Sequence, residues 1–386
     1  MECGGGRLPD VMGAAGIGAG GESGYYFRRR VVPTAAGVLG LTYGRGAFVC
    51  VMSDFTIMRR DAILAVSSPN VTSGSIGEAG SLEELGGAQV HGKITGLVDK
   101  IVDSDHEALE AIRKFLSYLP DHNRVAPTRI SVPSGADKAA VELPNLIPDE
   151  RRKTYDIRLA IEAVVDPGSF FELKGSFARS AVTGLARLNG QSIGVIATNP
   201  RYKGGALDAG SCSKITNFVV LCDSFNIPLI FLADTPGFLI GMEAERRGMA
   251  GKIMNFLAAV EEATVPKLAL VLRKSFGQAY INMGGGKADE TAAWFSSEIS
   301  FMDPKIAASV IFTGNADDNG KSLEHLATEL SADTTPYSLA EPYFAHAIID
   351  PRDTRSYLIS RLAIHSRSLT NGVGEHRMAN WPPVSF

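Results

Sequence analysis

Apolar strands alternate with helices along the second half of the chain, and this alternation constrains the fold more than any other feature. The pattern predicts strands at residues 193–198, 229–233 and 268–272, and helices at 211–223, 252–263 and after Gly277. The helix at 211–223 is expected to be amphipathic and to end before Asn226 and Pro228. Because the strands are apolar throughout, helices must cover both faces of their sheet, which indicates an α/β fold.

The first third of the chain is less regular. Strands are expected at 38–41, 56–58 and 63–66, a buried helix from residue 47, and an amphipathic helix over 107–118 whose apolar side carries Ala108, Leu109, Ile112 and Leu116. Residues 119–153 contain five prolines and many charges, a composition typical of linkers. We therefore expect domains at 1–118 and 154–386, joined by a linker at 119–153.

Two segments share one design, which indicates an internal repeat. In the second half, Asp234-Thr235-Pro236-Gly237 precedes Gly277-Gln278-Ala279-Tyr280, and Gly277 lies 43 residues after Asp234. In the first third, Glu2-Cys3-Gly4-Gly5 precedes Gly44-Arg45-Gly46-Ala47, and Gly44 lies 42 residues after Glu2. Each copy is expected to contain an acidic turn, an apolar strand and a small-residue turn that begins a helix.

The small-residue turns have a chemical meaning. Glycine and alanine allow a ligand oxygen to approach the backbone, and the first N–H groups of a helix have no partner within the helix. Two such N–H groups form a hole for an oxyanion, such as the enolate made by removing a proton next to a thioester. The expected donors are Arg45 and Gly46 in one turn and Gln278 and Ala279 in the other. The alternative is that the glycines only allow strand and helix to pack closely.

Composition excludes several other classes of protein. The formal net charge is -4 and no long basic tract is present, so nucleic acid is not an expected partner. No uninterrupted apolar stretch is long enough to span a membrane, and no signal peptide is visible. Cys3, Cys50, Cys212 and Cys222 form no CxxC pair, which favours buried free thiols over a metal site. The expected location is the cytoplasm, or the mitochondrial matrix in a eukaryote.

At these residues the sequence resembles the carboxyltransferase β subunits of biotin-dependent acyl-CoA carboxylases, such as the propionyl-CoA and methylcrotonyl-CoA enzymes. The resemblance runs in order over about residues 1–350. The matching stretches are Ser53-Asp54-Phe55, Glu83-Glu84-Leu85-Gly86-Gly87 with His91, Arg187-Leu188-Asn189-Gly190, Leu207-Asp208, Asn226-Ile227-Pro228-Leu229, Asp234-Thr235-Pro236-Gly237-Phe238, Ala263-Thr264-Val265-Pro266-Lys267 and Arg273-Lys274-Ser275-Phe276-Gly277.

The resemblance implies two crotonase-like domains, each a β-spiral with helices, in a hexamer whose active sites lie between subunits. It implies that the turn at Gly44, Arg45 and Gly46 holds the thioester oxygen of an acyl-CoA. The turn at Gly277, Gln278 and Ala279 would hold the ureido oxygen of biotin. It also implies that Ile281 lines the acyl pocket, and that Tyr280, Gly237 and Phe238 lie beside the substrates.

The implied reaction moves a carboxyl group from biotin, attached to a carrier protein, to the α-carbon of an acyl-CoA. The implied partners are a biotin carboxyl carrier protein and a biotin carboxylase. No protein base is needed, and we expect His91 to be a structural or CoA-side residue and Asp234 to be a turn former. The family has further residues before the point where this chain begins, so the N-terminal domain is expected to be incomplete.

Two other functions fit the same residues. One is the reverse reaction, in which a decarboxylase subunit loads biotin from a carboxylated acyl-CoA. The other is a non-catalytic assembly subunit that pairs with a longer homologue. The bulky residues Arg45 and Gln278, which stand where the family has small ones, are compatible with catalysis only if their side chains point away from the ligand.

Overall fold

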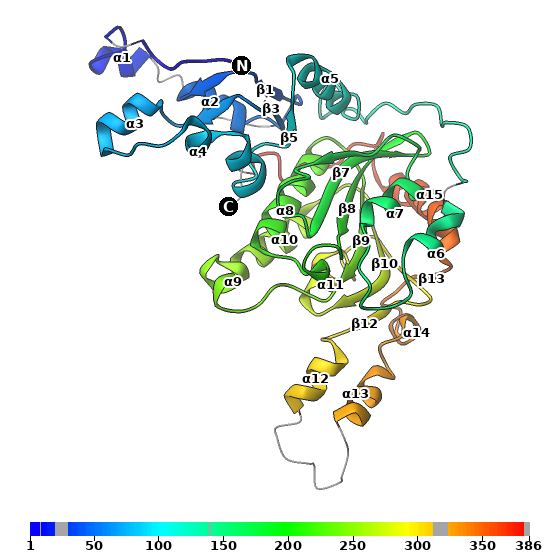
Figure 1. The fold of residues 1–386 in the computed structure, drawn as a ribbon. Helices are drawn as coiled ribbons and strands as arrows, with labels where there is room; N and C mark the ends of the chain where they lie inside the picture. Colours follow the sequence, from blue (N-terminus) through cyan, green and yellow to red (C-terminus); the bar gives the residue numbers. More distant parts are fainter. Residues whose placement is uncertain (8, 20–29, 139, 312–322, 382–386) are drawn as a thin grey trace.

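The computed structural model describes residues 1–7, 9–19, 30–138, 140–311 and 323–381 (Figure 1). At its centre is an eight-stranded sheet in the order β13-β11-β10-β9-β8-β7-β6, with β12 also paired to β10. Pairs from β8 to β13 are parallel, and β6, β7 and β8 are antiparallel. The strands are β6 (Phe171–Leu173), β7 (Ala181–Leu188), β8 (Gln191–Thr198), β9 (Leu229–Thr235), β10 (Lys267–Phe276), β11 (Glu290–Trp294), β12 (Glu298–Ser300) and β13 (Ala347–Ile349).

Helices cover both faces of this sheet, as the apolar strands require. On one face pack α8 (Ala209–Ser224) and α10 (Met249–Glu262), and on the other α7 (Ile157–Val164) and α15 (Thr354–His365) (Figure 1). The α/β prediction is therefore confirmed. Shorter helices follow the strand ends: α9 (Met242–Arg246), α11 (Gln278–Asn282), α12 (Pro304–Ile311), α13 (Leu323–Ser331) and α14 (Pro336–Ala340).

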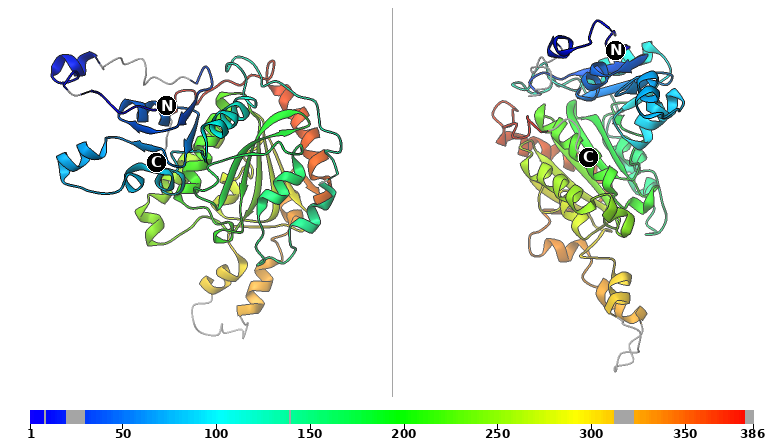
Figure 2. Two further views of the ribbon diagram at one scale, coloured as in Figure 1. Left: turned by 45° about the horizontal axis from the view of Figure 1, so that its top comes forward. Right: turned by 90° about the vertical axis from the view of Figure 1, so that its left-hand side faces the viewer.

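The N-terminal part contains two small parallel sheets, β1-β3-β5 and β2-β4. It packs on the α8 side of the large sheet (Figure 2), and its Phe55 and Phe115 rings stack 4.6 Å apart within the shared core. Its elements are α1 (Ala14–Ala19), β1 (Ala35–Val38), β2 (Leu41–Tyr43), α2 (Arg45–Val51), β3 (Phe55–Arg59), β4 (Ile63–Ala65), α3 (Pro69–Ile76), α4 (Leu82–Gly86), the π-helix η2 (Val90–Ile94), β5 (Lys100–Val102) and α5 (Asp105–Leu116).

The predicted repeat is visible in the strand pairing. β1 pairs with β3, and β3 with β5, as β10 pairs with β11, and β11 with β13. β2 pairs with β4 as the end of β10 pairs with β12. In the N-terminal part the register pairs are Ala35 with Phe55, Ile57 with Lys100, and Thr42 with Leu64. The corresponding pairs in the C-terminal part, in the same order, are Leu268 with Glu290, Ala292 with Ala347, and Ser275 with Ile299.

The match extends to the first residues of the chain. Cys3 bridges Thr42 in parallel, as Thr235 at the end of β9 pairs with Ser275. The two parts of the chain therefore share one topology.

Three local expectations were wrong. The strand expected at 38–41 is interrupted at Leu39 and Gly40, where β1 ends and β2 begins. The buried side of α5 carries Ala108, Ala111 and Phe115, while Leu109 is 48% exposed, because the stacking of Phe115 sets the rotation of the helix. The helix α8 is buried on nearly every side rather than amphipathic, because the sheet, α10 and the N-terminal part all pack around it.

The segment 119–153 is not structureless in its described residues. It contains η3 (Ala140–Glu142) and α6 (Leu143–Leu146). Leu143 and Ile147 are buried in the core cluster that also contains α7 and α15 residues. The end of this segment therefore packs with the C-terminal part of the chain.

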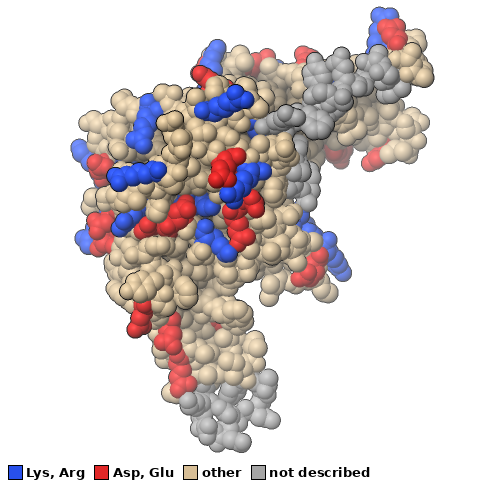
Figure 3. Space-filling view, turned by 180° about the vertical axis from the view of Figure 1, so that it is seen from behind, with Lys and Arg blue, Asp and Glu red and all other residues tan. Residues whose placement is uncertain are grey.

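Charges are mixed on the surface. On the face in Figure 3, lysine and arginine side chains lie among aspartates and glutamates, so that face has no field of a single sign. Among the described residues, no helix is both long enough and apolar enough to cross a bilayer.

Candidate functional site

The turn after β10 has a backbone conformation that glycine permits. Gly277 has φ 60° and ψ −149°, and its N–H donates to Ser300 O at 2.9 Å on the neighbouring strand β12. A side chain there would be strained by the positive φ, and a Cβ would lie 3.0 Å from Phe301 O. Helix α11 begins at the next residue.

The first N–H groups of α11 are available to a ligand. Across the described ranges, neither Gln278 N–H nor Ala279 N–H donates to another protein group, whereas Tyr280 N–H already bonds Gly277 O at 3.0 Å. Ala279 is fully buried, whereas Gln278 is exposed. Two adjacent N–H groups at the start of a helix are the kind of donors that an oxyanion hole requires.

The bulky Gln278 lies along its own helix. Its Nε2 donates to Asn282 Oδ1 at 2.9 Å, and Asn282 Nδ2 donates to Ile253 O at 2.9 Å. The side chain is therefore held on α11 while the backbone donor remains available. This is the arrangement in which a large residue at this position is compatible with a ligand.

The turn after β2 repeats the geometry. Gly44 has φ 55° and ψ −126°, and its N–H donates to the carbonyls of Ala65 (3.3 Å) and Val66 (3.1 Å) beside β4. Gly46 is buried, and a Cβ on it would lie 2.7 Å from Cys3 Cβ, so only glycine fits. Both turns thus use the first N–H to bind the adjacent strand and present the next residues at a helix start.

Gly237 lies next to Gly277 at one edge of the sheet. Gly237 has φ 130°, and a Cβ on it would come within 3.9 Å of Phe276 O. Its carbonyl accepts Leu207 N–H at 3.1 Å, and Phe238 forms a bridge with Leu207. The carboxyl ends of β9 and β10 therefore meet here, where ligands bind in parallel sheets.

Tyr280 does not point into open space. Its ring packs against the small cluster of Val271, Ala293 and Ile299, and burial raises the pKa of its hydroxyl to about 12. The hydroxyl is buried and no group in the described part of the chain bonds it. The neighbouring Ile281 is half-buried. Tyr280 as a whole residue is half-buried too, so burial does not distinguish the two.

The two turns lie apart within one chain. Figure 1 shows α2 in the N-terminal part above the large sheet, and α11 beside the strands of the large sheet, near the middle of the molecule. The structure therefore brings Gly237, Phe238 and Gly277 to Ile281 together, but it does not bring Gly44 to Gly46 near them.

Asp234 was expected to form a turn and does not. It is the penultimate residue of β9 and is fully buried. Its carboxylate accepts Arg273 Nε at 3.0 Å, Lys274 Nζ at 2.7 Å and the Tyr155 hydroxyl at 2.9 Å. Arg273 also donates to three carbonyls of residues 148–153. Asp234 is a structural ion-pair centre beneath the strand ends, a role that only the packing of β9 against β10 reveals.

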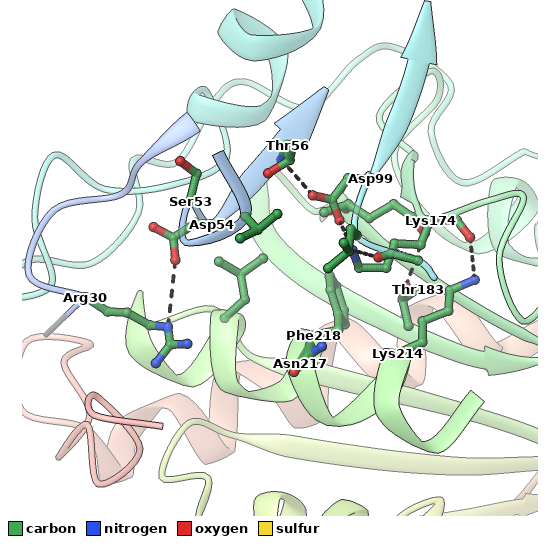
Figure 4. A pocket seen from close by; sticks show the side chains of 15 residues that line it. Arg30, Ser53, Asp54, Thr56, Asp99, Lys174, Thr183, Lys214, Asn217 and Phe218 are labelled. Carbon is green, nitrogen blue, oxygen red and sulfur yellow. Dashed lines mark hydrogen bonds and ion pairs between the residues drawn. The ribbon is translucent and has the colours of Figure 1, made fainter. Parts of the chain in front are cut away.

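Ser53 and Asp54 of the Ser53-Asp54-Phe55 motif line a small pocket between the N-terminal part and the large sheet (Figure 4). Its volume is about 60 Å³, which is room for a few water molecules. Asp99 ties the two parts together by accepting Thr56 N–H at 2.8 Å and pairing with Lys174 Nζ at 3.0 Å. This pocket is a joint within the chain rather than a catalytic site.

Lys214 of α8 lies at this joint and was missed in the sequence, because nothing local marks a buried lysine. Its Nζ donates to the carbonyls of Lys174 (2.9 Å), Phe177 (3.0 Å) and Ala181 (2.7 Å). Burial lowers its pKa from 10.5 to about 7. The amino group therefore holds the loop 174–181 in place, and its burial disfavours the charged form.

The lowered pKa of Lys214 leads us to expect that the stability of the protein depends on pH. Between about pH 7 and 10.5 the unfolded chain binds more protons at residue 214 than the folded chain. The free energy of unfolding should therefore rise with pH in this window, by at most about 1.4 kcal/mol per pH unit from this group. Urea denaturation at several pH values should show a steeper rise in the wild type than in Lys214→Met. Equal slopes in the two proteins would contradict the assignment.

No group of three or more histidine, cysteine, aspartate or glutamate side chains that could hold a metal ion occurs among the described residues. The four cysteines are free thiols, and Cys50, Cys212 and Cys222 are buried as expected. Cys3 is partly exposed beside Gly46.

Comparison with known proteins shows the class to which this fold belongs. A model of the carboxyl transferase domain matches residues 9–378, and the chain belongs to this family. It is 36% identical to the propionyl-CoA carboxylase carboxyltransferase subunit of Haloferax mediterranei, over 92% of this chain and 72% of that protein. It is 32% identical to the methylmalonyl-CoA decarboxylase subunit alpha of Veillonella parvula, over 86% of this chain and 65% of that protein.

Solved structures give the same relationship. The crystal structure of the transcarboxylase 12S hexamer, with methylmalonyl-coenzyme A and methylmalonic acid bound, superposes with a TM-score of 0.82 at 35% identity. That match covers 87% of this chain and 66% of the other. The present chain thus spans 65% to 72% of the length of these three relatives.

Proposed function

We propose that this chain is the carboxyltransferase part of a biotin-dependent acyl-CoA carboxylase. It would move a carboxyl group between biotin on a carrier protein and the α-carbon of an acyl-CoA. The observation that carries the proposal is the pair of matched glycine turns, each of which begins a helix. Gly44 and Gly277 share a positive φ and an N–H bond to the adjacent strand, and in the second turn the N–H groups of Gln278 and Ala279 bond no other described protein group.

The residues present suit both substrates. The unpartnered N–H groups of Gln278 and Ala279 fit the ureido oxygen of biotin, which supplies the carboxyl group and accepts the α-proton when bound. The turn at Gly44, Arg45 and Gly46 would hold the thioester oxygen and stabilise it as the enolate forms. Backbone donors fixed in this way require no reorganisation when charge develops on the oxygen.

The described residues around the turns offer no obvious protein base, which fits this scheme. Burial lowers the pKa of His91, and both of its ring nitrogens lie within bonding distance of protein oxygens. Asp234 is fully engaged by Arg273, Lys274 and Tyr155. In the proposed reaction, the nitrogen of bound biotin would take the α-proton, so these residues need not act as bases.

The fold supports a finer proposal. Residues 1–118 and 154–386 would be two crotonase-like domains joined by 119–153, since the strand registers repeat between them. Because the two turns lie apart in one chain, an active site would form between the N-terminal part of one subunit and the C-terminal part of another. The transcarboxylase 12S relative is described as a hexamer, which would provide such contacts.

Exposed apolar side chains beside both turns support the same assembly. Val66 is 74% exposed and Phe301 is 83% exposed, and they follow the matched strands β4 and β12. A second subunit covering each turn would bury them. The partners proposed for the reaction are a biotin carboxyl carrier protein and a biotin carboxylase.

The reaction can be tested with the chain as it stands. Purified protein mixed with a biotin carboxylase, a biotinylated carrier, ATP and labelled bicarbonate should transfer label to one or more of acetyl-, propionyl- and butyryl-CoA. The same mixture without the carrier is the control and should transfer none. Absence of transfer with the chain alone, but transfer after adding a longer homologue, would instead support an assembly subunit.

The reverse direction is the second candidate, because a decarboxylase subunit is among the relatives. Incubation with methylmalonyl-CoA and unloaded carrier should then load the carrier with a carboxyl group faster than the forward reaction unloads it. The ratio of the two rates, measured under matched concentrations, distinguishes the candidates.

A further inference from the structure

His91 makes an unusual contact with the outer edge of β4. Its Nε2 lies 2.6 Å from the carbonyl oxygen of Leu64, and the histidine is buried within the π-helix η2. Gly86 packs closely against the same carbonyl, since a Cβ on it would lie 2.1 Å from Leu64 O. The Glu83–Gly87 motif and His91 therefore converge on one backbone oxygen.

Leu64, which carries that oxygen, directly precedes the two residues that accept the Gly44 N–H. Leu64 is followed by Ala65 and Val66, whose carbonyls accept the Gly44 N–H at 3.3 and 3.1 Å. Leu64 also pairs in register with Thr42, two residues before Gly44. Any shift of β4 along or away from β2 would therefore move the acceptors of the Gly44 N–H and rotate the start of α2.

The hydrogen bonds around His91 assign a neutral ring with the proton on Nε2. Leu97 N–H donates to Thr95 Oγ1 at 3.3 Å, so the Thr95 hydroxyl can donate its own proton to Nδ1, 3.0 Å away. Nε2 then carries the hydrogen that the Leu64 carbonyl accepts. With both nitrogens used in this way, the ring cannot take a proton from a substrate.

The second half of the chain fastens the equivalent strand differently. Ile299 is the register counterpart of Leu64, and its N–H donates to Thr334 O at 2.8 Å. The outer edge of β12 is thus held by a backbone group, whereas the outer edge of β4 depends on a side chain. A single substitution can therefore loosen one turn and leave the other unchanged.

We propose that His91 is a positioning residue for the reaction, which fixes β4 through the Leu64 carbonyl and so aims the N–H groups of the Gly44 turn. The inference rests on the proposed function for its catalytic consequence. Its structural part, the coupling of residue 91 to the Gly44 turn, does not.

Two variants of similar size test whether the bond from residue 91 to Leu64 O positions the Gly44 turn. In His91→Gln the side-chain amide nitrogen can occupy the place of Nε2 and still donate to Leu64 O, whereas in His91→Asn it is too short to do so. The asparagine variant should exchange the Gly44 amide hydrogen about 10-fold faster than the wild type and the glutamine variant. Hydrogen exchange of the peptide covering residues 41–48, with the peptide covering 274–281 as internal control, measures this.

The catalytic readout uses the same pair. With the carrier and acyl-CoA that the wild type accepts, His91→Asn should lower kcat by about 10- to 100-fold with KM changed by less than about threefold, and His91→Gln should recover most of the rate. Equal exchange and equal kcat in all three proteins would overturn the inference. So would a loss of thermal stability in His91→Asn with unchanged kcat for the folded protein. A contrast in exchange, with no transfer even by the wild type, would refute the proposed function and leave the coupling intact.

Discussion

Replacing Gln278 with proline is expected to lower kcat for carboxyl transfer by about 10²- to 10³-fold, the effect of removing one donor from an oxyanion hole. Gln278 is the first residue of α11, a position where proline is tolerated because its missing N–H has no partner in the helix. In the described structure the Gln278 N–H bonds no protein group, so the fold should lose little. Steady-state kinetics at saturating acyl-CoA and carrier measure the change.

Gln278→Ala is the matched control. It removes the side chain and its bond to Asn282 but keeps the backbone N–H. Its kcat should stay within about threefold of the wild type. A folded proline variant with full activity would show that the C-terminal turn is not an oxyanion hole. An equal loss in both variants would assign the role to the side chain instead.

Replacing Asp234 with asparagine is expected to cost about 3–5 kcal/mol of stability, because it removes the charge that two buried cations share. Arg273 and Lys274 are both nearly buried, and their bonds to the carboxylate are 3.0 and 2.7 Å long. Asparagine keeps the shape of the side chain, so the loss reports the charge. The free energy of unfolding from urea denaturation measures it.

An exposed ion pair gives the comparison for this prediction. Glu243 in α9 pairs with Arg247, the residue that directly follows this helix, and both side chains are 68% exposed. Glu243→Gln should therefore change the free energy of unfolding by less than about 1 kcal/mol. If Asp234→Asn is no more destabilising than Glu243→Gln, the buried cluster does not stabilise the strand ends as described.

Most of the fold follows from local pattern. Strands such as β8, β9 and β10 are apolar over their whole length, so their type and their burial on both faces are visible in the sequence. The rotation of α5 about its axis was not visible in the sequence. Phe115 stacks on Phe55 in the core, and this contact turns Leu109 and Leu116 toward solvent. The interior position of α8 was not visible either, since three different parts of the chain pack around it.

The candidate site divides in the same way. Both glycine turns were found in the sequence, because a glycine at a strand-to-helix junction leaves a short local pattern. Lys214, His91 and Asp234 acquire their roles from partners far away in the chain, namely the carbonyls of 174–181, Leu64 and Lys274. No spacing rule predicts such pairs. The identity of the acyl group is equally hidden, since half-buried apolar side chains such as Phe238 and Ile281 select no particular acyl chain.

The matched conformation of Gly44 and Gly277 has a consequence for which substitutions the sequence can accept after each glycine. The proposed donors belong to the main chain, and the side chains of Arg45 and Gln278 at the positions that follow are exposed. Almost any residue except proline at positions 45 and 278 therefore preserves the donors, and a saturation library at these two positions should retain many active members. Under the proposed function, the side chains at these two positions could vary while the backbone donors stay in place.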